Sequence, residues 1–350
     1  MEAYRLGGAL GGGTFGSVFS ARRKACKAHE AAGGEGEEGE VALKKVALSS
    51  TKWVPSAALR EVLSLRLTDG HPNVVRLLDV FAHGLSLCLV MELAHIDMDV
   101  FLETNAPRSK SNNSNNNNNN ISMSFKSQEP MWDEAMAKYL GREILQGVAH
   151  LHSCGIMHRD LKPGNVLMWK DGRVKLGDFG LARSFRYEDG RTFSHQIMTR
   201  WFRAPEILFG SRRYDATVDV WAIGVIFGTF LNACETLFPG DNDIDQISRV
   251  AHLLGSHPWT AEADADFVPD VGKLVFPDTD RILLTALAKR CPQASSDYLH
   301  LVDTMLQYVD RPTAQDCLHH EVFITDPLPQ FSLDVMHWPS PSHPQNLKHS

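Results

Sequence analysis

His158-Arg159-Asp160-Leu161-Lys162-Pro163-Gly164-Asn165, followed by Asp178-Phe179-Gly180, is the part of this sequence that decides the fold. It brings two carboxylates, an amide and a lysine together within a short span. Asp160 can accept a proton from a hydroxyl group, and Lys162 can neutralise an anionic group. Asn165 and the aspartate that opens the second motif offer the hard oxygen ligands that Mg²⁺ prefers beside phosphates. Surface polar residues would reach this spacing only through several coincidences, so the pattern predicts a site for a metal-bound phosphate.

A glycine-rich run lies near the start of the chain, at Leu10-Gly11-Gly12-Gly13-Thr14-Phe15-Gly16-Ser17-Val18. Glycine lets the backbone approach phosphate oxygens closely, but the run alone is weak evidence because glycine-rich turns also occur in ordinary hairpins. A dinucleotide-binding fold would need a helix directly afterwards. Ser17-Val18-Phe19-Ser20 instead continues as a strand, which favours a loop that lies over a nucleotide.

A candidate ion pair follows this run. Lys44 ends the apolar strand-like segment Val41-Ala42-Leu43, and Glu61 lies on a helix predicted from Ser56 to Leu67. A lysine at a strand end can simply be solvated, which is how we interpret Lys45. Paired with Glu61, the Lys44 ammonium would instead be fixed on the α- and β-phosphates of a nucleotide.

The composition is that of an ordinary globular protein, with 43% hydrophobic and 22% charged residues in 350. A net charge of −7 argues against a nucleic-acid-binding protein. The six cysteines are scattered without a C-x-x-C pair, which disfavours a disulfide framework or a zinc site. No signal peptide and no apolar run of membrane-spanning length are visible. We expect a cytoplasmic protein with no nucleic-acid partner and no membrane insertion.

The chain changes from strand-rich to helical along its length, and two polar insertions interrupt it. Apolar residues at helical spacing predict helices from Asp133 to His152 and from Val218 to Leu231. The insertions, near 25–40 and 105–130, lack the apolar residues of a core, and the second contains a near-pure Asn tract. We expect both to be solvated, and the proline-rich tail at 324–350 to be irregular.

From about Tyr4 to Phe323, the sequence resembles the eukaryotic protein kinases, because its motifs occur in that family's order. Those motifs are the glycine-rich run, Val41-Ala42-Leu43-Lys44, His158-Arg159-Asp160, Asp178-Phe179-Gly180 and Ala204-Pro205-Glu206. The resemblance implies an α+β fold with a strand-rich N-lobe at 4–93 that carries one main helix, and a helical C-lobe at 94–323. ATP and Mg²⁺ are the expected ligands.

The resemblance also implies a role for each matching residue. Those expected to act in catalysis are Asp160, Lys162, Lys44 and Glu61, and the metal ligands are Asn165 and Asp178. The implied ATP-binding residues are Leu10, Gly11, Gly12, Gly13, Thr14, Phe15, Gly16, Ser17, Val18, Ala42, Lys44, Met91, Glu92, Ala94, Asp97 and Leu167. Asp219 would hold the catalytic loop, the segment from His158 to Asn165, in place. Glu206 and Arg311 would form a structural ion pair.

Within the family, the chain resembles the cyclin-dependent kinase group. Lys162 and Thr199 are typical of serine/threonine-specific kinases. The segment from Val54 to Glu61 resembles the group's cyclin-contacting helix, which implies a cyclin-like activator. Arg203 corresponds to the arginine associated with proline after the target residue, so we expect protein substrates phosphorylated in a proline-directed manner.

The segment from Asp178 to Glu206 resembles the group's activation segment and places its activating phosphosite at Ser194. An upstream activating kinase is therefore an expected partner. The phosphate-binding arginines that the resemblance implies are Arg60, Arg159 and Arg183. The absence of a Thr-x-Tyr pair argues against a mitogen-activated kinase. Phe15, where the group often has tyrosine, removes inhibitory phosphorylation at that position.

Three segments, Val41 to Leu48, Leu237 to Ile244 and Phe323 to Pro329, most resemble the cell-cycle-related kinase branch, whose members regulate cilium or flagellum length. This resemblance adds the nucleus and the cilium or flagellum as expected locations. The segment from Gln196 to Trp201 also suits the branch that activates other cyclin-dependent kinases, which stays an alternative. A pseudokinase scaffold is a non-enzymatic alternative. It would lack at least one of Lys44, Asp160, Asn165 and Asp178, and all four are present. A small-molecule kinase fits poorly, because Ala204-Pro205-Glu206 resembles the protein-substrate platform.

Overall fold

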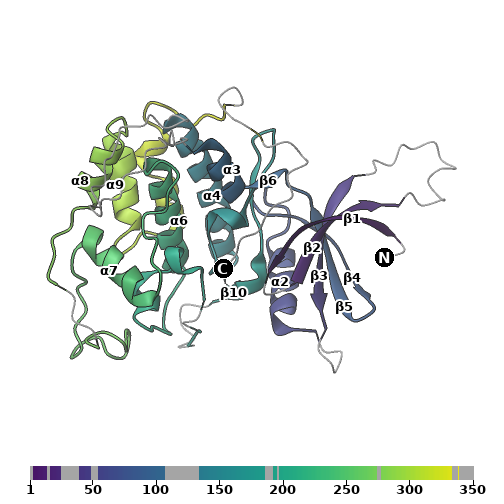
Figure 1. The fold of residues 1–350 in the computed structure, drawn as a ribbon, viewed down its shortest axis with the longest axis horizontal. Coiled ribbons are helices and arrows are strands. Elements are labelled where there is room, and N and C mark those ends of the chain that lie inside the picture. Colours follow the sequence, from purple (N-terminus) through teal and green to yellow (C-terminus); the bar gives the residue numbers. More distant parts are fainter. Residues whose placement is uncertain are drawn as a thin grey trace, which may run out of the picture. The chain divides into compact units, whose positions relative to one another are not determined.

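The structure, a computed structural model, describes residues 3–13, 16–24, 39–48, 54–106, 134–185, 192–194, 197–273, 277–332 and 338 (Figure 1). Residues 25–38 and 107–133, which hold most of the two predicted insertions, lie outside this part, as does Asp133. The chain forms two compact units. One comprises Met1–Val100 with Glu143–Gly190, and the other Phe101–Arg142 with Arg191–Trp338.

The first unit is built on a five-stranded antiparallel sheet in the order β1-β2-β3-β5-β4. Its strands are β1 (Tyr4–Gly13), β2 (Gly16–Arg23), β3 (Glu40–Ala47), β4 (Leu77–His83) and β5 (Ser86–Glu92). Side chains alternate across a strand, so Val41 and Leu43 of β3 share one face. There they join a buried cluster with Tyr4, Cys88 and Val90. The alternation turns Ala42 and Lys44 to the opposite face of the sheet.

Helix α2 (Ser56–Leu67) has the bounds that the sequence predicts. Ala58, Glu61 and Leu65 are buried along one side of it. This spacing of three and four residues follows the helical repeat, so Glu61 points inward with the apolar residues.

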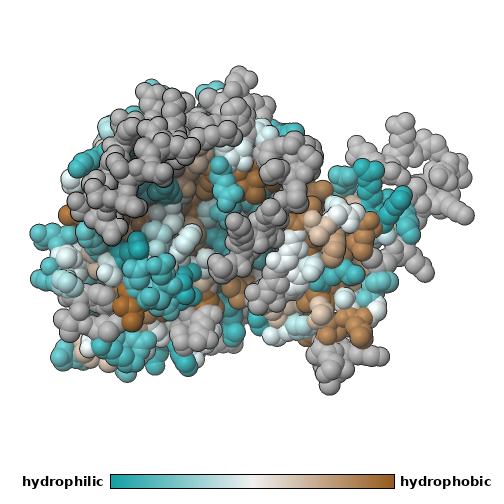
Figure 2. Space-filling view, in the orientation of Figure 1, coloured by the Kyte–Doolittle hydropathy of each residue, from teal (hydrophilic) through white to brown (hydrophobic). Residues whose placement is uncertain are grey.

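The surface of this unit also carries hydrophobic side chains. On the face drawn in Figure 2, brown hydrophobic atoms show among teal ones over the sheet. Among the described residues of the unit, the large hydrophobic side chains that are exposed are Leu59, Leu63, Leu67, Leu78 and Leu85.

Short strands hold the residues around the predicted catalytic loop. Three of them form a small sheet in the order β6-β8-β9, and two more pair as β7 with β10. They are β6 (Ile96–Asp97), β7 (Ile156–Met157), β8 (Val166–Met168), β9 (Val174–Leu176) and β10 (Arg183–Ser184). The catalytic loop therefore connects β7 to β8, and Asp178 follows β9 after Gly177.

The second unit is helical. The helices after the catalytic loop are α5 (Pro205–Leu208), α6 (Thr217–Leu231), α7 (Asp243–Leu254), α8 (Leu283–Arg290), α9 (Ser296–Met305) and α10 (Ala314–Leu318). Two others, α3 (Met98–Asn105) and α4 (Glu134–Ser153), contribute residues to both units. From Val218 to Leu231, α6 is buried all round, as its apolar sequence predicts. No described helix is long and apolar enough to cross a membrane.

Two buried ion pairs stabilise the second unit. Arg311 pairs with Glu206, both almost fully buried, which confirms the predicted structural pair. Lys138 of α4 pairs with Glu134 and also donates to the carbonyl oxygens of Thr325 and Pro327. The described start of the tail has no helix or strand, and these bonds hold it against α4.

Candidate active site

Lys44 lies between two carboxylates from distant parts of the chain. Its Nζ atom is 2.7 Å from Oε1 of Glu61 on α2 and 2.8 Å from Oδ1 of Asp178 after β9. Only 7% of the Lys44 side chain and 1% of that of Glu61 are exposed, whereas Asp178 is 44% exposed. The buried pair thus holds Asp178 at the more open side of the site.

The charges of these residues stabilise one another. Burial by itself disfavours the charged lysine, but Glu61 and Asp178 outweigh it and raise the pKa of Lys44. Burial would likewise raise the pKa of Asp178, but the nearby ammonium lowers it below its ordinary value. Near neutral pH, Lys44 is therefore a cation and Asp178 an anion, which are the forms that phosphate and metal binding require.

The catalytic loop is tied together by hydrogen bonds. His158 donates from Nε2 to the carbonyl oxygen of Gly177 (2.9 Å), while its Nδ1 accepts from the amide of Asp160 (3.3 Å). Asn165 donates from Nδ2 to the backbone oxygen of Asp160 (2.7 Å) and to its carboxylate (3.0 Å). Lys162 Nζ is 3.5 Å from the same carboxylate. Asp160 is thereby oriented by two neighbours, as a proton acceptor needs to be.

The loop also reaches the segment that carries Asp178. The amide of Gly177 donates to the carbonyl oxygen of Asn165 at 2.9 Å. Asp178 and Arg159 both have left-handed backbones, with φ of 52° and 63°. This conformation costs a residue with a side chain about 1–2 kcal/mol, and residues held in it cluster at functional sites.

The donor set fits magnesium. Asn165 uses its amide nitrogen on Asp160, which leaves an oxygen for a cation, and Asp178 brings a carboxylate held in its charged form. Mg²⁺ binds through few protein oxygens and completes its shell with phosphates and water. Among the described residues, no group of three or more His, Cys, Asp or Glu side chains could by itself hold a metal ion.

The glycine-rich run forms the tip of the β1–β2 hairpin, as expected of a loop between strands. Leu10, Gly11, Gly12 and Gly13 end β1, and Gly16, Ser17 and Val18 begin β2. Gly16 has φ of 148°, and a Cβ atom there would lie 2.3 Å from the carbonyl oxygen of Lys45. No other residue fits that position without a shift of β3. Thr14 and Phe15 lie outside the described residues.

Strand pairing brings other predicted nucleotide-binding residues together. Ala42 pairs with Met91, and Asp97 pairs with Leu167 across β6 and β8. Asp97 has a structural task that the sequence analysis missed, because its Oδ1 accepts from the amide of Val100 at the start of α3 (2.9 Å).

The segment around Ala94, between β5 and β6, is held from both sides. Glu92 is the last residue of β5, and the amide of His95 donates to the carbonyl oxygen of Met168 at 3.0 Å. The Glu92 side chain also pairs with Lys175 of β9 at 2.7 Å. No motif of the sequence points to this ion pair.

Arg60, Arg159 and Arg183 form the predicted cluster of positive charge. Burial, and then the charges of Arg159 and Arg183, lower the pKa of Arg60. The Nε of Arg60 is buried without a hydrogen-bond partner among the described residues. Crowded guanidinium groups are a site that an anion would stabilise.

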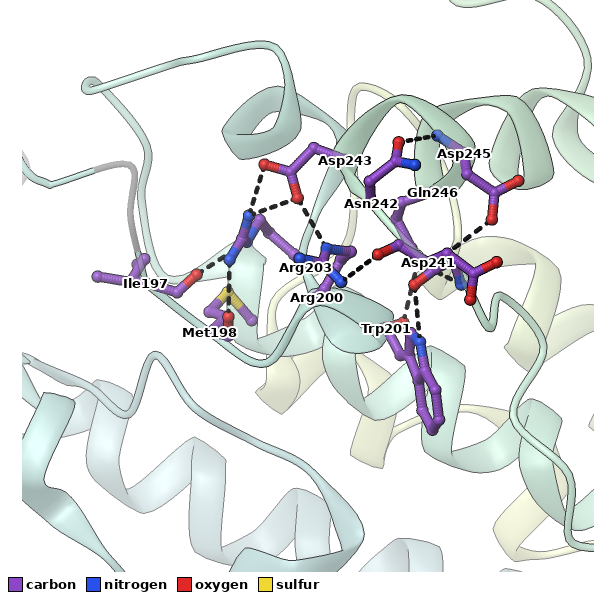
Figure 3. A network of polar contacts seen from close by, with 11 residues as sticks. Ile197, Met198, Arg200, Trp201, Arg203, Asp241, Asn242, Asp243, Asp245 and Gln246 are labelled. Atoms are coloured by element: carbon purple, nitrogen blue, oxygen red, sulfur yellow. Dashed lines mark hydrogen bonds and ion pairs between the residues drawn. The ribbon is translucent and has the colours of Figure 1, made fainter. Parts of the chain in front are cut away.

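A second polar network lies in the other unit, around Arg203 (Figure 3). Arg203 donates from Nε to the carbonyl oxygen of Ile197 (2.9 Å) and from Nη2 to that of Met198 (3.0 Å). Its Nη1 meets both carboxylate oxygens of Asp243 at 3.1 and 3.2 Å. The sequence predicts Arg203 alone, because Met198 and Asp243 carry no signal until the fold brings them to it.

Ser194, the predicted phosphosite, is exposed, but its backbone is fixed. The hydroxyl of Tyr214 donates to the carbonyl oxygen of Ser194 at 2.7 Å, and the Tyr214 ring packs on Phe193. The amide of Phe193 donates to the carbonyl oxygen of Arg212 at 2.7 Å. The hydroxyl of Ser194 is thus presented to solvent from an anchored segment.

Comparisons with known proteins agree with this geometry. The family model described as "Protein kinase domain" matches residues 4–323. Cyclin-dependent kinase 20 of Danio rerio is 38% identical over 94% of this chain and 86% of its own length. The Rattus norvegicus protein of that name is 35% identical over 98% and 88%. A chain of the CAK complex of Chaetomium thermophilum bound to ATP-gamma-S superposes with a TM-score of 0.76 at 28% identity, covering 94% of this chain and 93% of that one.

The buried pair gives a stability prediction. Lys44→Met leaves the Glu61 carboxylate buried without its cation, and breaking a buried pair from one side costs about 3–5 kcal/mol. We expect the free energy of unfolding, measured by urea denaturation, to fall by about 3 kcal/mol. The double variant Lys44→Met/Glu61→Gln, which removes both charges, should recover much of this loss. Equal losses in the single and double variants would contradict the role of the pair.

Proposed function

The chain belongs to the protein kinase domain family, and on that premise we propose that it transfers the γ-phosphate of ATP to serine and threonine side chains of proteins. The observation that carries the proposal is the convergence within the first unit. Lys44 contacts both Glu61 and Asp178, and Asp160 contacts both Asn165 and Lys162. A pseudokinase scaffold would not need this complete set of contacts.

Each residue then has one task. Asp160 accepts the proton of the substrate hydroxyl while the hydroxyl oxygen forms a bond to the γ-phosphorus of ATP. The bond between this phosphorus and the oxygen that bridges to the β-phosphate breaks, which releases ADP. Lys162 lies 3.5 Å from the Asp160 carboxylate, so its ammonium can balance charge on the moving phosphoryl group. Lys44 holds the α- and β-phosphates. Asn165 and Asp178 would hold magnesium, which would supply further positive charge to the phosphates.

Asp160→Asn tests the proposal directly. The amide cannot accept the proton but keeps the shape and the partners of the side chain. We expect kcat to fall by about 10²–10⁴-fold, the usual contribution of general base catalysis, with the KM for ATP little changed. The measurement is transfer of labelled phosphate from Mg-ATP to a protein substrate. No transfer by the wild type, with Ser194 phosphorylated and the activating partner added, would instead favour a scaffold.

We propose that the substrates carry proline after the target residue, and the backbone of Met198 supports this. Met198 has φ of 65°, and its carbonyl oxygen is engaged by Arg203. It is therefore a poor acceptor for an amide of a bound peptide. Any residue except proline would bring such an amide, and a polar group left unsatisfied in a buried site costs about 1–3 kcal/mol. Proline has no amide hydrogen and loses nothing.

Two peptides that differ only in Ser-Pro against Ser-Ala test this preference. We expect kcat/KM to be about 5-fold to 150-fold higher for the proline peptide, the range that corresponds to a cost of about 1–3 kcal/mol for the unsatisfied amide. Steady-state kinetics with both peptides and one enzyme preparation give the ratio. A ratio near one would end the proposal of proline direction but not that of kinase activity.

We propose a cyclin-like activator that binds α2. Leu59, Leu63 and Leu67 lie four residues apart on this helix and are 48%, 61% and 64% exposed. Side chains with this spacing form one continuous stripe. A partner that covers the stripe would also fix the position of Glu61, which lies on the same helix and pairs with Lys44.

We propose that an upstream kinase activates the protein at Ser194, with Arg60, Arg159 and Arg183 as the phosphate-binding residues. Phosphoserine adds a charge of about −1.5 to −2, and each charge-assisted hydrogen bond contributes about 1.5–3 kcal/mol. Ordering a two-state segment almost completely needs about 5.5 kcal/mol. Two or three such bonds reach this value only before the entropy of ordering is subtracted, which supports a partner as a second input.

Ser194→Ala should therefore lower kcat/KM strongly in a preparation phosphorylated by the upstream kinase and bound to its partner. A loss of about tenfold or more is expected, because at least one charge-assisted bond is lost. Thr192→Ala, an exposed neighbour in the same segment, is the matched control and should keep the wild-type value. An unchanged kcat/KM for Ser194→Ala would remove this site from the proposal.

We propose control of cilium or flagellum length as the biological setting, because Val41 to Leu48, Leu237 to Ile244 and Phe323 to Pro329 resemble the cell-cycle-related kinase branch. The similarity to a chain of the CAK complex favours a second candidate, phosphorylation of other cyclin-dependent kinases. Loss of the protein would alter cilium length in the first case. In the second, it would remove an activating phosphate from another kinase.

A further inference from the structure

The arginine beside Met198 is held from two directions. On one side, Nε and Nη2 of Arg203 bind the carbonyl oxygens of Ile197 and Met198; on the other, Nη1 lies against the carboxylate of Asp243 (Figure 3). All three guanidinium nitrogens therefore have partners. Because a guanidinium is planar and rigid, fixing Nη1 also fixes the directions of the other two nitrogens.

Asp243 is well placed for this task. It is the first residue of α7, where Asn242 caps the helix by accepting from the amide of Asp245 (3.0 Å). A carboxylate in the first turn is favoured by the positive end of the helix dipole. Arg200 donates from Nε to the same carboxylate at 3.0 Å and from Nη1 to the carbonyl oxygen of Asp241 at 2.9 Å. The carboxylate is thus anchored by the helix and by a second arginine.

We propose that Asp243 is a positioning residue that sets the selectivity for proline after the target residue. The carboxylate of Asp243 holds Arg203 in place. Arg203 therefore stays hydrogen-bonded to the carbonyl oxygen of Met198, and the backbone of Met198 stays left-handed. Without the carboxylate, Arg203 loses one of its three anchors, and Met198 can relax toward an ordinary conformation. Its carbonyl oxygen then becomes available to the amide of a non-proline residue. This inference rests on the proline preference proposed above and adds the residue of α7 on which that preference depends.

The test compares kcat/KM for the Ser-Pro and Ser-Ala peptides within each preparation of the full chain. The ratio of the two values is independent of the fraction of folded or activated enzyme, so a merely structural effect of a substitution cancels. Asp243→Asn should lower the proline-to-alanine ratio about threefold to tenfold, the range expected for a partly exposed charge-assisted pair. The change should come mostly from improved use of the Ser-Ala peptide.

Further variants separate the proposal from its alternatives. Asp243→Ser removes the carboxylate but suits a helix start, and should lower the ratio equally. Asp243→Glu restores the charge and should recover part of the ratio. Asp245→Asn is the matched control, because Asp245 lies in the same helical turn but pairs with Arg249 (2.8 Å). It should keep the wild-type ratio.

If Asp243→Asn and Asp243→Ser both keep the wild-type proline-to-alanine ratio of kcat/KM, the role of Asp243 is overturned, but the proposed proline direction is not. A fall of equal size in Asp245→Asn would also overturn the role of Asp243, because the effect would then belong to the charge of the helix start. A wild-type enzyme without any preference would overturn the proposed proline direction, and with it this inference.

Discussion

The ammonium of Lys44 binds two carboxylates, one from a helix and one from the loop after β9. Burial makes this arrangement strong, because two of its charges have little access to water and must satisfy one another. It joins three segments that are remote in sequence and keeps Asp178 charged. The positions of Asp178, the proposed metal ligand, and of Lys44, the proposed phosphate-binding residue, therefore depend on the same contacts, and α2 cannot move without disturbing both.

A second set of constraints is made by the backbone. Arg159, Asp178 and Met198 all have left-handed conformations that their side chains disfavour. Near each of them, hydrogen bonds compensate. Arg159 donates from Nε to the carbonyl oxygen of Leu181, the amide of Gly177 donates to Asn165 beside Asp178, and Arg203 donates to the carbonyl oxygen of Met198. Strain of this kind persists only where the surrounding contacts hold the backbone in place. These residues lie in the predicted catalytic loop, at the proposed metal ligand and in the proposed peptide-binding segment.

The two units use arginine differently. In the first, Arg60 has a buried Nε without a partner among the described residues, and burial, followed by the charges of Arg159 and Arg183, lowers its pKa. Such a cluster is suited to an anion that arrives later, which agrees with the proposed activation by phosphorylation. In the second, all three nitrogens of Arg203 already have partners. That arginine is suited to shaping the backbone rather than to binding a new charge.

The sequence by itself determined the family, the bounds of α2, most of α4 and α6, and the chemical types at the site, because motifs such as His158-Arg159-Asp160 are local. It also predicted the Glu206–Arg311 pair through the resemblance. Only the tertiary structure decided the Glu92–Lys175 pair, the capping task of Asp97 and the contact of Asp243 with Arg203. Each of these joins groups whose partnership depends on how strands and helices pack. An aspartate at a helix start looks the same in sequence whether it faces water or an arginine, since only the fold sets its neighbours.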